Sequence, residues 1–158
     1  MKFMMNGALT LGTRDGATIE MAQKAGDENF FLFGLTADQV ADSRGWYSPR
    51  WHYDNEPEVR AALDLISSDH FSRDEPGIFA PLLETLLGRE YYMHLADLRS
   101  YLEADRKLCA LYGDPDAWAR KAILNVGGLR QVLERSDDRG VRTGHLAGAA
   151  VSGLMNRR

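Results

Sequence analysis

At 158 residues the chain has the length of one domain, and its 44% hydrophobic and 27% charged residues are the composition of a globular protein. The net charge of -4 and the interspersed acidic and basic residues argue against nucleic-acid binding. The single cysteine, Cys109, excludes an internal disulfide and a cysteine-rich metal site, and without an export or membrane signal we expect a cytoplasmic protein.

Strand and helix signals alternate over the first part of the chain. Helix formers lead to the pair Asn6-Gly7, which typically ends a helix, and LTLGT over residues 9–13 then alternates like a short strand. Residues 18–25 return to helical spacing, and NFFLFG over residues 29–34 is typical of a fully buried strand. TADQVADS has the spacing of a capping box and predicts a further helix. This alternation predicts a parallel α/β sheet.

An aromatic-rich loop is predicted over residues 44–57. Its aromatic residues include Trp46, Tyr47, Trp51 and Tyr53. Rings of this size either pack over a neighbouring apolar surface or stack on a ligand. Packing is the favoured interpretation, and stacking on a ligand is the alternative that the sequence leaves open.

The chain after this loop has the pattern of amphipathic helices. Pro57 suits the first position of a helix, and Pro76 begins a second helix that ends before Gly88. The apolar stripe of the first of these consists of Val59, Leu63 and Ile66. The part of the chain after the predicted sheet is therefore predicted to be rich in helix.

Two further elements are predicted towards the C-terminus. YYMHLAD predicts a short strand that leads into a helix over residues 98–112. Asp114 and Pro115 are typical of the start of a helix. One apolar face of this last helix is expected to contain Trp118, Ala122, Ile123 and Val126.

Common catalytic and metal-binding motifs are absent from the sequence. It contains no GxGxxG, Walker loop, HExxH or GxSxG pattern. The histidines do not lie at a metal-ligand spacing from one another, so we interpret each as a surface or packing residue. They are His52, His70, His94 and His145. No metal site is therefore predicted.

Lys2 stands apart because its neighbours are Met1, Phe3, Met4 and Met5. A lysine buried among such side chains loses hydration, which favours the neutral amine and makes it a candidate for imine formation with an aldehyde cofactor. The alternative is an exposed lysine beside a start methionine. The residues alone leave both interpretations open.

The opening segment, MKFMMNGALTLGTRDGATIEM, resembles the pyridoxal-phosphate lysine segment of the α-glucan phosphorylases, which act on glycogen, starch and maltodextrin. The family pattern, N-M-K-F-M-x-N-G-A-L-T-x-G-T-x-D-G-A-N-V-E-M, is matched at nearly every fixed position. Later segments agree in order: ENFFLFG, YDNEPEVRAALDLISS, ADLRSYLEA and LYGDPDAWARKAILNV. The resemblance covers Met1 to about Val126. The chain departs from it at Arg14, usually an aliphatic residue, and at Thr18, usually asparagine.

The resemblance implies a fold and a reaction. Residues 1–128 would be part of the Rossmann-like C-terminal domain of a two-domain glycosyltransferase of the GT-B type. Lys2 would carry pyridoxal phosphate as a Schiff base, and the cofactor's phosphate would assist proton transfer to and from inorganic phosphate. Inorganic phosphate attacks the terminal α-1,4-linked glucose of a glucan and releases glucose 1-phosphate with retained configuration. The resemblance places no catalytic side chain in this chain, and intact members of the family are usually homodimers.

The family's glycine-rich segment before the lysine, its other phosphate ligands, its sugar-binding residues and its N-terminal domain have no counterpart in the chain. We therefore expect a fragment of the enzyme that is inactive alone. The alternative is a non-catalytic α/β binding or interaction module in which Lys2 is a surface residue. An exposed apolar patch would favour the fragment, and a closed polar surface would favour the module.

The sequence departs from the family after Val126. The family continues with G-K-F-S-S-D-R-T, then E-Y-A and I-W, whereas this chain continues with GGLRQVLERSDDRGVRTGHL. Codons for residues 129–146, read with a slip of one nucleotide, can encode the family's ending. We therefore expect a frameshift near Gly127 to Leu129 and an out-of-frame, disordered tail over residues 129–158.

Overall fold

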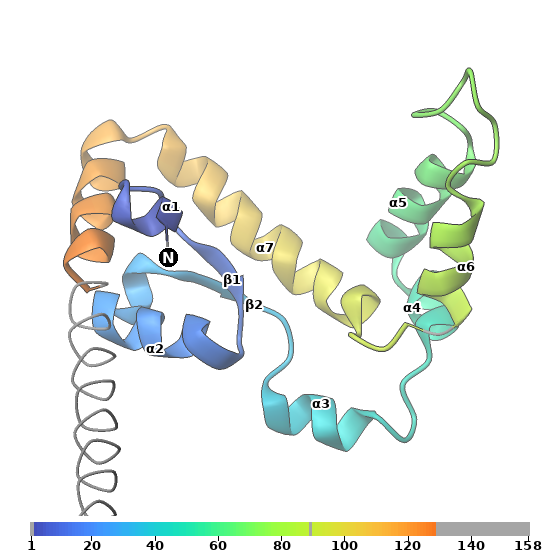
Figure 1. Ribbon diagram of the computed structural model, residues 1–158, viewed down its shortest axis with the longest axis horizontal. Coiled ribbons are helices and arrows are strands. Elements are labelled where there is room, and N and C mark those ends of the chain that lie inside the picture. Colours follow the sequence, from blue (N-terminus) through green and yellow to red (C-terminus); the bar gives the residue numbers. More distant parts are fainter. Residues whose placement is uncertain (1, 89, 129–158) are drawn as a thin grey trace, which may run out of the picture. The chain divides into compact units, whose positions relative to one another are not determined.

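The computed structural model describes residues 2–88 and 90–128, and Figure 1 shows their helices and strands. The chain divides into two compact units. The first unit comprises residues 2–10, 16–30 and 114–128, and the second comprises residues 11–15, 31–88 and 90–113. Both units are rich in helix, and the second holds a small parallel sheet, which is consistent with an α/β protein.

The first unit is built from short helices. They are α1 (Lys2–Met5), α2 (Gly16–Ala25), the 3₁₀ turn η1 (Asp27–Asn29) and a helix over residues 115–128, drawn in orange in Figure 1. α1 ends before the pair Asn6-Gly7, as predicted. α2 begins earlier than the predicted start at residue 18 and ends at Ala25, as predicted. The buried apolar side chains of the unit are Met4, Met21, Ala22, Ala25 and Phe30.

Asn125 joins the helix over residues 115–128 to the segment after α2. It is 0% exposed, and its side-chain amide donates hydrogen bonds to the backbone oxygens of Asn29 (2.8 Å) and Lys121 (2.9 Å). The Asn29 side-chain amide in turn donates to the backbone oxygen of Ala25 at 2.7 Å. These buried donors satisfy carbonyl groups that are shielded from water, so they are part of what holds the unit together.

Gly128 makes the closest backbone approach in the first unit. A Cβ atom at this position would lie 2.6 Å from the Cα of Ala25 and 2.7 Å from its nitrogen. These atoms belong to a backbone and cannot rotate away as the end of a side chain can. The helix over residues 115–128 therefore contacts α2 through a position that requires glycine.

The predicted apolar face of this helix is wrong in part. Trp118 and Ala122 are half-buried, but Ile123 is 71% exposed and Val126 is also exposed. The buried side instead continues through Asn125, which keeps helical spacing with the first two residues. The reason is that this side meets backbone carbonyl groups, which need a donor rather than another apolar side chain.

The sheet of the second unit is a parallel pair. β1 (Leu11–Thr13) and β2 (Phe31–Phe33) run side by side, with Gly12 opposite Leu32. This confirms the predicted parallel sheet. β2 is half-buried rather than fully buried as predicted. Within the described residues the sheet has two strands, so β2 has a hydrogen-bonded neighbour on one edge only, whereas full burial requires cover on every side.

Helices make up the rest of the second unit. They are α3 (Ala37–Ser43), α4 (Pro49–Asn55), α5 (Pro57–Ser67), α6 (Ala80–Gly88) and α7 (His94–Tyr112). Figure 1 shows α7 running beside the strands, with α4 and α5 near its N-terminal end. Val59 and Leu63 from α5 and Leu95 from α7 form the buried apolar cluster. Partly buried side chains pack around it, at Tyr53, Ile66, Leu83, Leu86, Leu87 and Leu98. The predicted stripe of α5 thus faces the core.

Helix starts are set by side-chain caps that the sequence contains. The predicted capping box between Thr36 and Gln39 is confirmed at the start of α3. α4 lies inside the segment that was predicted to be a loop, and this prediction is wrong. Ser48 is its N-cap and accepts a hydrogen bond from the Trp51 N–H at 3.4 Å, and Pro49 occupies the first helical position.

Two left-handed residues shift the predicted starts of α6 and α7. α6 begins at Ala80 rather than at Pro76, because Gly77 has a φ of 81° and cannot continue a helix in that conformation. The predicted strand YYMHLAD is also wrong. Met93 has a φ of 58°, and α7 begins at the next residue, His94, so this segment turns into a helix instead of extending.

The predicted frameshift, the disordered tail and His145 lie outside the described residues. The domain boundary at residue 128 likewise stays a prediction. Within residues 2–88 and 90–128, no helix combines the length and the hydropathy that crossing a bilayer requires.

Candidate functional site

Lys2 is the first residue of α1, and its side chain is exposed. The backbone around it is held by hydrogen bonds from the Ala8 N–H to the Phe3 oxygen (3.0 Å) and from the Asn6 side-chain amide to the Lys2 oxygen (2.8 Å). These bonds fix the position of the Lys2 backbone within the first unit. They leave the ε-amine accessible to solvent.

The apolar neighbours of Lys2 do not enclose it. Met4 is buried, whereas Phe3 and Met5 are exposed beside Lys2. Of the two interpretations that the sequence leaves open, the exposed lysine is therefore the one observed. An accessible primary amine still fits the attachment of an aldehyde cofactor. The adjacent residues contribute apolar side chains to such a site rather than ligands for a phosphate group.

A cavity of about 420 Å³ with several polar lining residues lies in the second unit where the parallel strands end. We call it the strand-end pocket, and its polar lining residues are Thr13, Asp15, Arg44, Tyr92, His94 and Asp97. The Thr13 hydroxyl donates to the Asp15 carboxylate at 2.8 Å. Parallel α/β sheets generally bind ligands outside the carboxyl ends of their strands. The pocket therefore occupies the position at which such a sheet is expected to carry chemistry.

Asp97 is held at this pocket by the end of β2. Its Oδ1 accepts a hydrogen bond from the Leu35 N–H, and the Ser100 hydroxyl oxygen accepts one from the Gly34 N–H, both at 2.8 Å. Gly34 has a φ of 83°, and a Cβ atom there would lie 2.7 Å from the Asp97 carboxylate. Burial raises the pKa of the Asp97 carboxyl, while the bond from Leu35 opposes the rise.

The carboxyl group of Glu90 is buried and is paired with a tyrosine. The Tyr47 hydroxyl donates to Oε2 of Glu90 at 2.6 Å, and Oε1 of Glu90 has no hydrogen-bond partner within the described part of the chain. Burial raises the pKa of Tyr47, and the hydrogen bond to Glu90 raises it further. The backbone N–H groups of Ala96 and Leu95, in the first turn of α7, lower the pKa and so oppose this rise. The hydroxyl is therefore a protonated donor at neutral pH.

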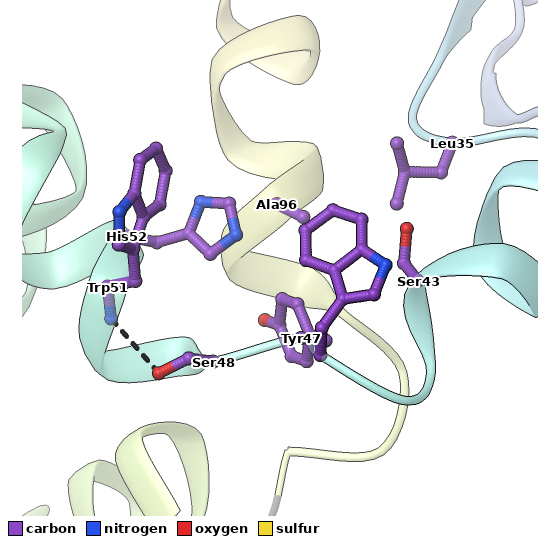
Figure 2. A pocket seen from close by; sticks show the side chains of 8 residues that line it. Leu35, Ser43, Tyr47, Ser48, Trp51, His52 and Ala96 are labelled. Atoms are coloured by element: carbon purple, nitrogen blue, oxygen red, sulfur yellow. Dashed lines mark hydrogen bonds between the residues drawn. The ribbon is translucent and has the colours of Figure 1, made fainter.

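The predicted aromatic segment lines a second cavity, of about 390 Å³, which we call the aromatic pocket. Figure 2 shows its lining side chains, which are Leu35, Ser43, Trp46, Tyr47, Ser48, Trp51, His52 and Ala96. Trp46 is 75% exposed and Trp51 is 56% exposed, whereas Tyr47 and Tyr53 are half-buried. The favoured interpretation, packing on a neighbouring surface, holds for the tyrosines and fails for the tryptophans.

Metal ligands do not gather in the described residues. Within residues 2–88 and 90–128, no three His, Cys, Asp or Glu side chains are placed to hold one metal ion. His52 lies in the aromatic pocket, where its Nδ1 is 3.0 Å from the Glu56 carboxylate. His94 lies in the strand-end pocket.

Sequence reasoning missed both pockets, the half-buried Asp97 carboxyl group and the buried Glu90 carboxyl group. A signal for the strand-end pocket exists, because Asp15 and Leu35 each follow a parallel strand and must lie near the same edge. The pairing of Tyr47 with Glu90 joins positions 43 residues apart, and no local pattern connects them. The pair Ser48-Pro49 was a further signal, since an N-cap serine followed by proline predicts a helix start and places Trp51 and Tyr53 on that helix.

Comparison with known proteins gives one consistent result. The family model described as carbohydrate phosphorylase matches residues 1–143. Glycogen phosphorylase of Synechocystis sp. is 43% identical over 143 residues, which are 90% of this chain and 16% of the relative. The muscle form of human glycogen phosphorylase is 42% identical over 128 residues, and the human brain form is 43% identical over 127 residues. Each of these human alignments covers 80% of this chain and 15% of the relative, so the chain spans only a small part of their length.

Proposed function

The chain belongs to the carbohydrate phosphorylase family, and we propose that it is part of an enzyme that phosphorolyses terminal α-1,4-glucosidic bonds of glucans. The observation that carries the proposal is the family match, which begins at the segment containing Lys2. The substrates are an α-glucan and inorganic phosphate, and the product is glucose 1-phosphate.

Lys2 holds pyridoxal phosphate through its amine in this proposal. When bound, the cofactor supplies a phosphate group that exchanges a proton with inorganic phosphate during the transfer. The chain's own contribution is placement, because the bonds of Asn6 and Ala8 fix the backbone that carries Lys2. The match of the surrounding segment to the family supports this role, whereas the exposure of the Lys2 side chain does not distinguish it from a surface lysine.

The proposal extends to the architecture of the intact enzyme. Residues 1–128 belong to the Rossmann-like C-terminal domain of a GT-B glycosyltransferase, and the intact enzyme is a cytoplasmic homodimer. The parallel pair of β1 and β2, with α7 packed against β2, supports the α/β part of this assignment.

We expect the chain alone to be inactive, as a fragment rather than as an independent binding module. Large apolar side chains are exposed on both units, which supports the fragment over a module with a closed polar surface. They include Phe3, Phe71, Ile78 and Ile123. The small share of the relatives' length that the chain spans points the same way.

Reductive labelling tests the role of Lys2. The 158-residue chain is incubated with limiting pyridoxal phosphate, reduced with borohydride and mapped by peptide mass spectrometry. We expect saturable label at Lys2, and we expect Lys2→Arg to abolish it while Lys107→Arg, at another exposed lysine, leaves it unchanged. In the intact enzyme, Lys2→Arg is expected to abolish release of glucose 1-phosphate.

The labelling experiment also has a clear contrary result. Label spread evenly over the lysines, or label that persists near the N-terminus in Lys2→Arg, would show that the amine is only one accessible amine among several. Because Lys2→Arg keeps the positive charge and removes the primary amine, it separates the attachment chemistry from electrostatic attraction of the cofactor.

A further inference from the structure

The aromatic pocket presents two tryptophans that the second unit leaves largely exposed. Trp46 precedes α4 and Trp51 lies within it, and both line a cavity of about 390 Å³. Exposed aromatic rings that gather at one cavity offer apolar faces on which a ligand can stack. The volume lies in the range of roughly 300–1,000 Å³ that is typical of small-molecule sites.

The polar groups of the pocket are few and are oriented by other bonds. Nδ1 of His52 lies 3.0 Å from the Glu56 carboxylate, and in the tautomer that donates through Nδ1–H the other ring nitrogen, Nε2, is an acceptor. Figure 2 shows the His52 ring on the side of the pocket near Ala96 of α7. The Ser48 oxygen accepts from the Trp51 N–H, which leaves the Ser48 hydroxyl hydrogen free to donate. The pocket thus offers at least one acceptor and one donor.

Charge further restricts the class of ligand. None of the residues that line the aromatic pocket is an Asp, Glu, Lys or Arg. A phosphate group would therefore lose hydration there without gaining the opposite charge of a Lys or Arg side chain. A purely apolar ligand would leave the His52 and Ser48 groups without partners. The lining fits a neutral molecule with apolar faces and hydroxyl groups around its rim.

A pyranose ring has this character, since its faces carry C–H groups and its edge carries hydroxyls. We propose that the aromatic pocket binds a short stretch of α-1,4-linked glucan, with Trp46 and Trp51 against the sugar faces and His52 and Ser48 at the hydroxyls. This contact is separate from the Lys2 chemistry and holds the polymer rather than cleaving it. The choice of an α-glucan among carbohydrates rests on the proposed function, whereas the fit to a sugar rests on the pocket.

Binding of maltoheptaose to the 158-residue chain tests the proposal by calorimetry and tryptophan fluorescence. We expect saturable binding, about tenfold weaker in Trp46→Ala and in Trp51→Ala, and undetectable binding in the double variant. Trp118, in the first unit, remains as an internal fluorescence reference in the double variant. Trp46→Phe retains an aromatic face and is expected to recover most of the affinity.

Matched controls separate stacking in this pocket from general surface effects. Phe71 is 62% exposed and lines neither the aromatic pocket nor the strand-end pocket, so Phe71→Ala is expected to leave maltoheptaose binding unchanged. The tryptophan variants are checked by circular dichroism, and we expect their folds to be intact because the replaced side chains are exposed.

Three results would overturn the proposal. Absence of saturable maltoheptaose binding removes the site, and binding that survives the double substitution places it elsewhere. Equal binding of a β-linked cello-oligosaccharide overturns the assignment to α-glucans. Lys2→Arg is expected to bind maltoheptaose normally, so a failure of cofactor labelling at Lys2 and a failure of glucan binding are distinguishable.

Discussion

The two units of the chain are stabilised by different kinds of buried contact. In the second unit, Val59, Leu63 and Leu95 form an aliphatic cluster with other apolar side chains packed around it. In the first unit, an amide side chain, Asn125, is fully buried and donates to backbone oxygens, and Gly128 brings two backbones into contact. Aliphatic packing tolerates exchange of similar shapes, whereas a buried amide and a glycine contact each depend on one residue type.

This difference bears on how each unit responds to substitution. In the second unit, the loss of unfolding free energy on substitution depends on how much of a side chain is removed, because the cluster is stabilised in proportion to the apolar area it buries. The first unit also buries apolar side chains such as Met4, Met21 and Phe30, but its stability depends in addition on hydrogen-bond geometry at Asn125 and on backbone clearance at Gly128.

Leu63→Ala tests the aliphatic cluster and has the largest expected effect. Removal of the buried side chain is expected to lower the free energy of unfolding by about 2–5 kcal/mol. Leu65→Ala, on the same helix at an exposed position, is the control and is expected to change it by about 0.5 kcal/mol or less. Urea denaturation followed by circular dichroism measures both, and equal losses would contradict a core centred on α5.

Gly128→Ala tests the backbone contact of the first unit. We expect a loss of about 3 kcal/mol, because the added Cβ would meet the Ala25 backbone and the helices would have to separate. Gly127→Ala is the matched control, since nothing lies within 4 Å of its Cβ, and it is expected to stabilise the helix by about 0.5–1 kcal/mol. Trp118 fluorescence in a Trp46→Phe/Trp51→Phe background reports on this unit during urea unfolding. Similar results for the two glycines would refute the close approach.

Tyr47→Phe tests the polar pair of Tyr47 and the buried Glu90 in the second unit. Removing the hydroxyl leaves Glu90, already unpartnered at Oε1, without its donor, so we expect a loss of roughly 1–3 kcal/mol. Tyr53→Phe removes a hydrogen bond of the same 2.6 Å length to Asp64, and this bond is exposed to solvent although the ring is half-buried. Little change in the free energy of unfolding is therefore expected. A thermal or urea unfolding series compares them. If both tyrosine variants behave alike, burial is not what gives the Glu90 bond its strength.

Much of the local structure follows from the sequence, because it depends on neighbours in the chain. The capping box at Thr36, the proline at the start of α5 and the stripe through Val59 and Leu63 are short-range signals that the structure realises. The parallel pairing of β1 and β2 also follows from the strand and helix order. The family match is recognisable from the Lys2 segment for the same reason, since its pattern is contiguous.

The features that the sequence does not predict depend on contacts between distant segments. The left-handed conformation of Met93 turns a β-like segment into the approach to α7, against its local pattern. The burial of Asn125 in place of Ile123 follows from the carbonyl group of Asn29, far away in the chain. Both pockets arise where strands, loops and α7 meet, so their residues share no spacing that a periodic pattern can detect.

The pairing of Asp97 and Ser100 with the end of β2 has a consequence for both pockets. These side chains are one turn apart on α7 and accept from consecutive N–H groups, Leu35 and Gly34, so they set the rotation and the axial register of the helix together. A slip of α7 by one residue would break both bonds. Ala96 and Asp97, walls of the two pockets, are thereby positioned against the strand before any ligand arrives. Ligands of either pocket meet a preorganised wall, so less ordering entropy opposes their binding.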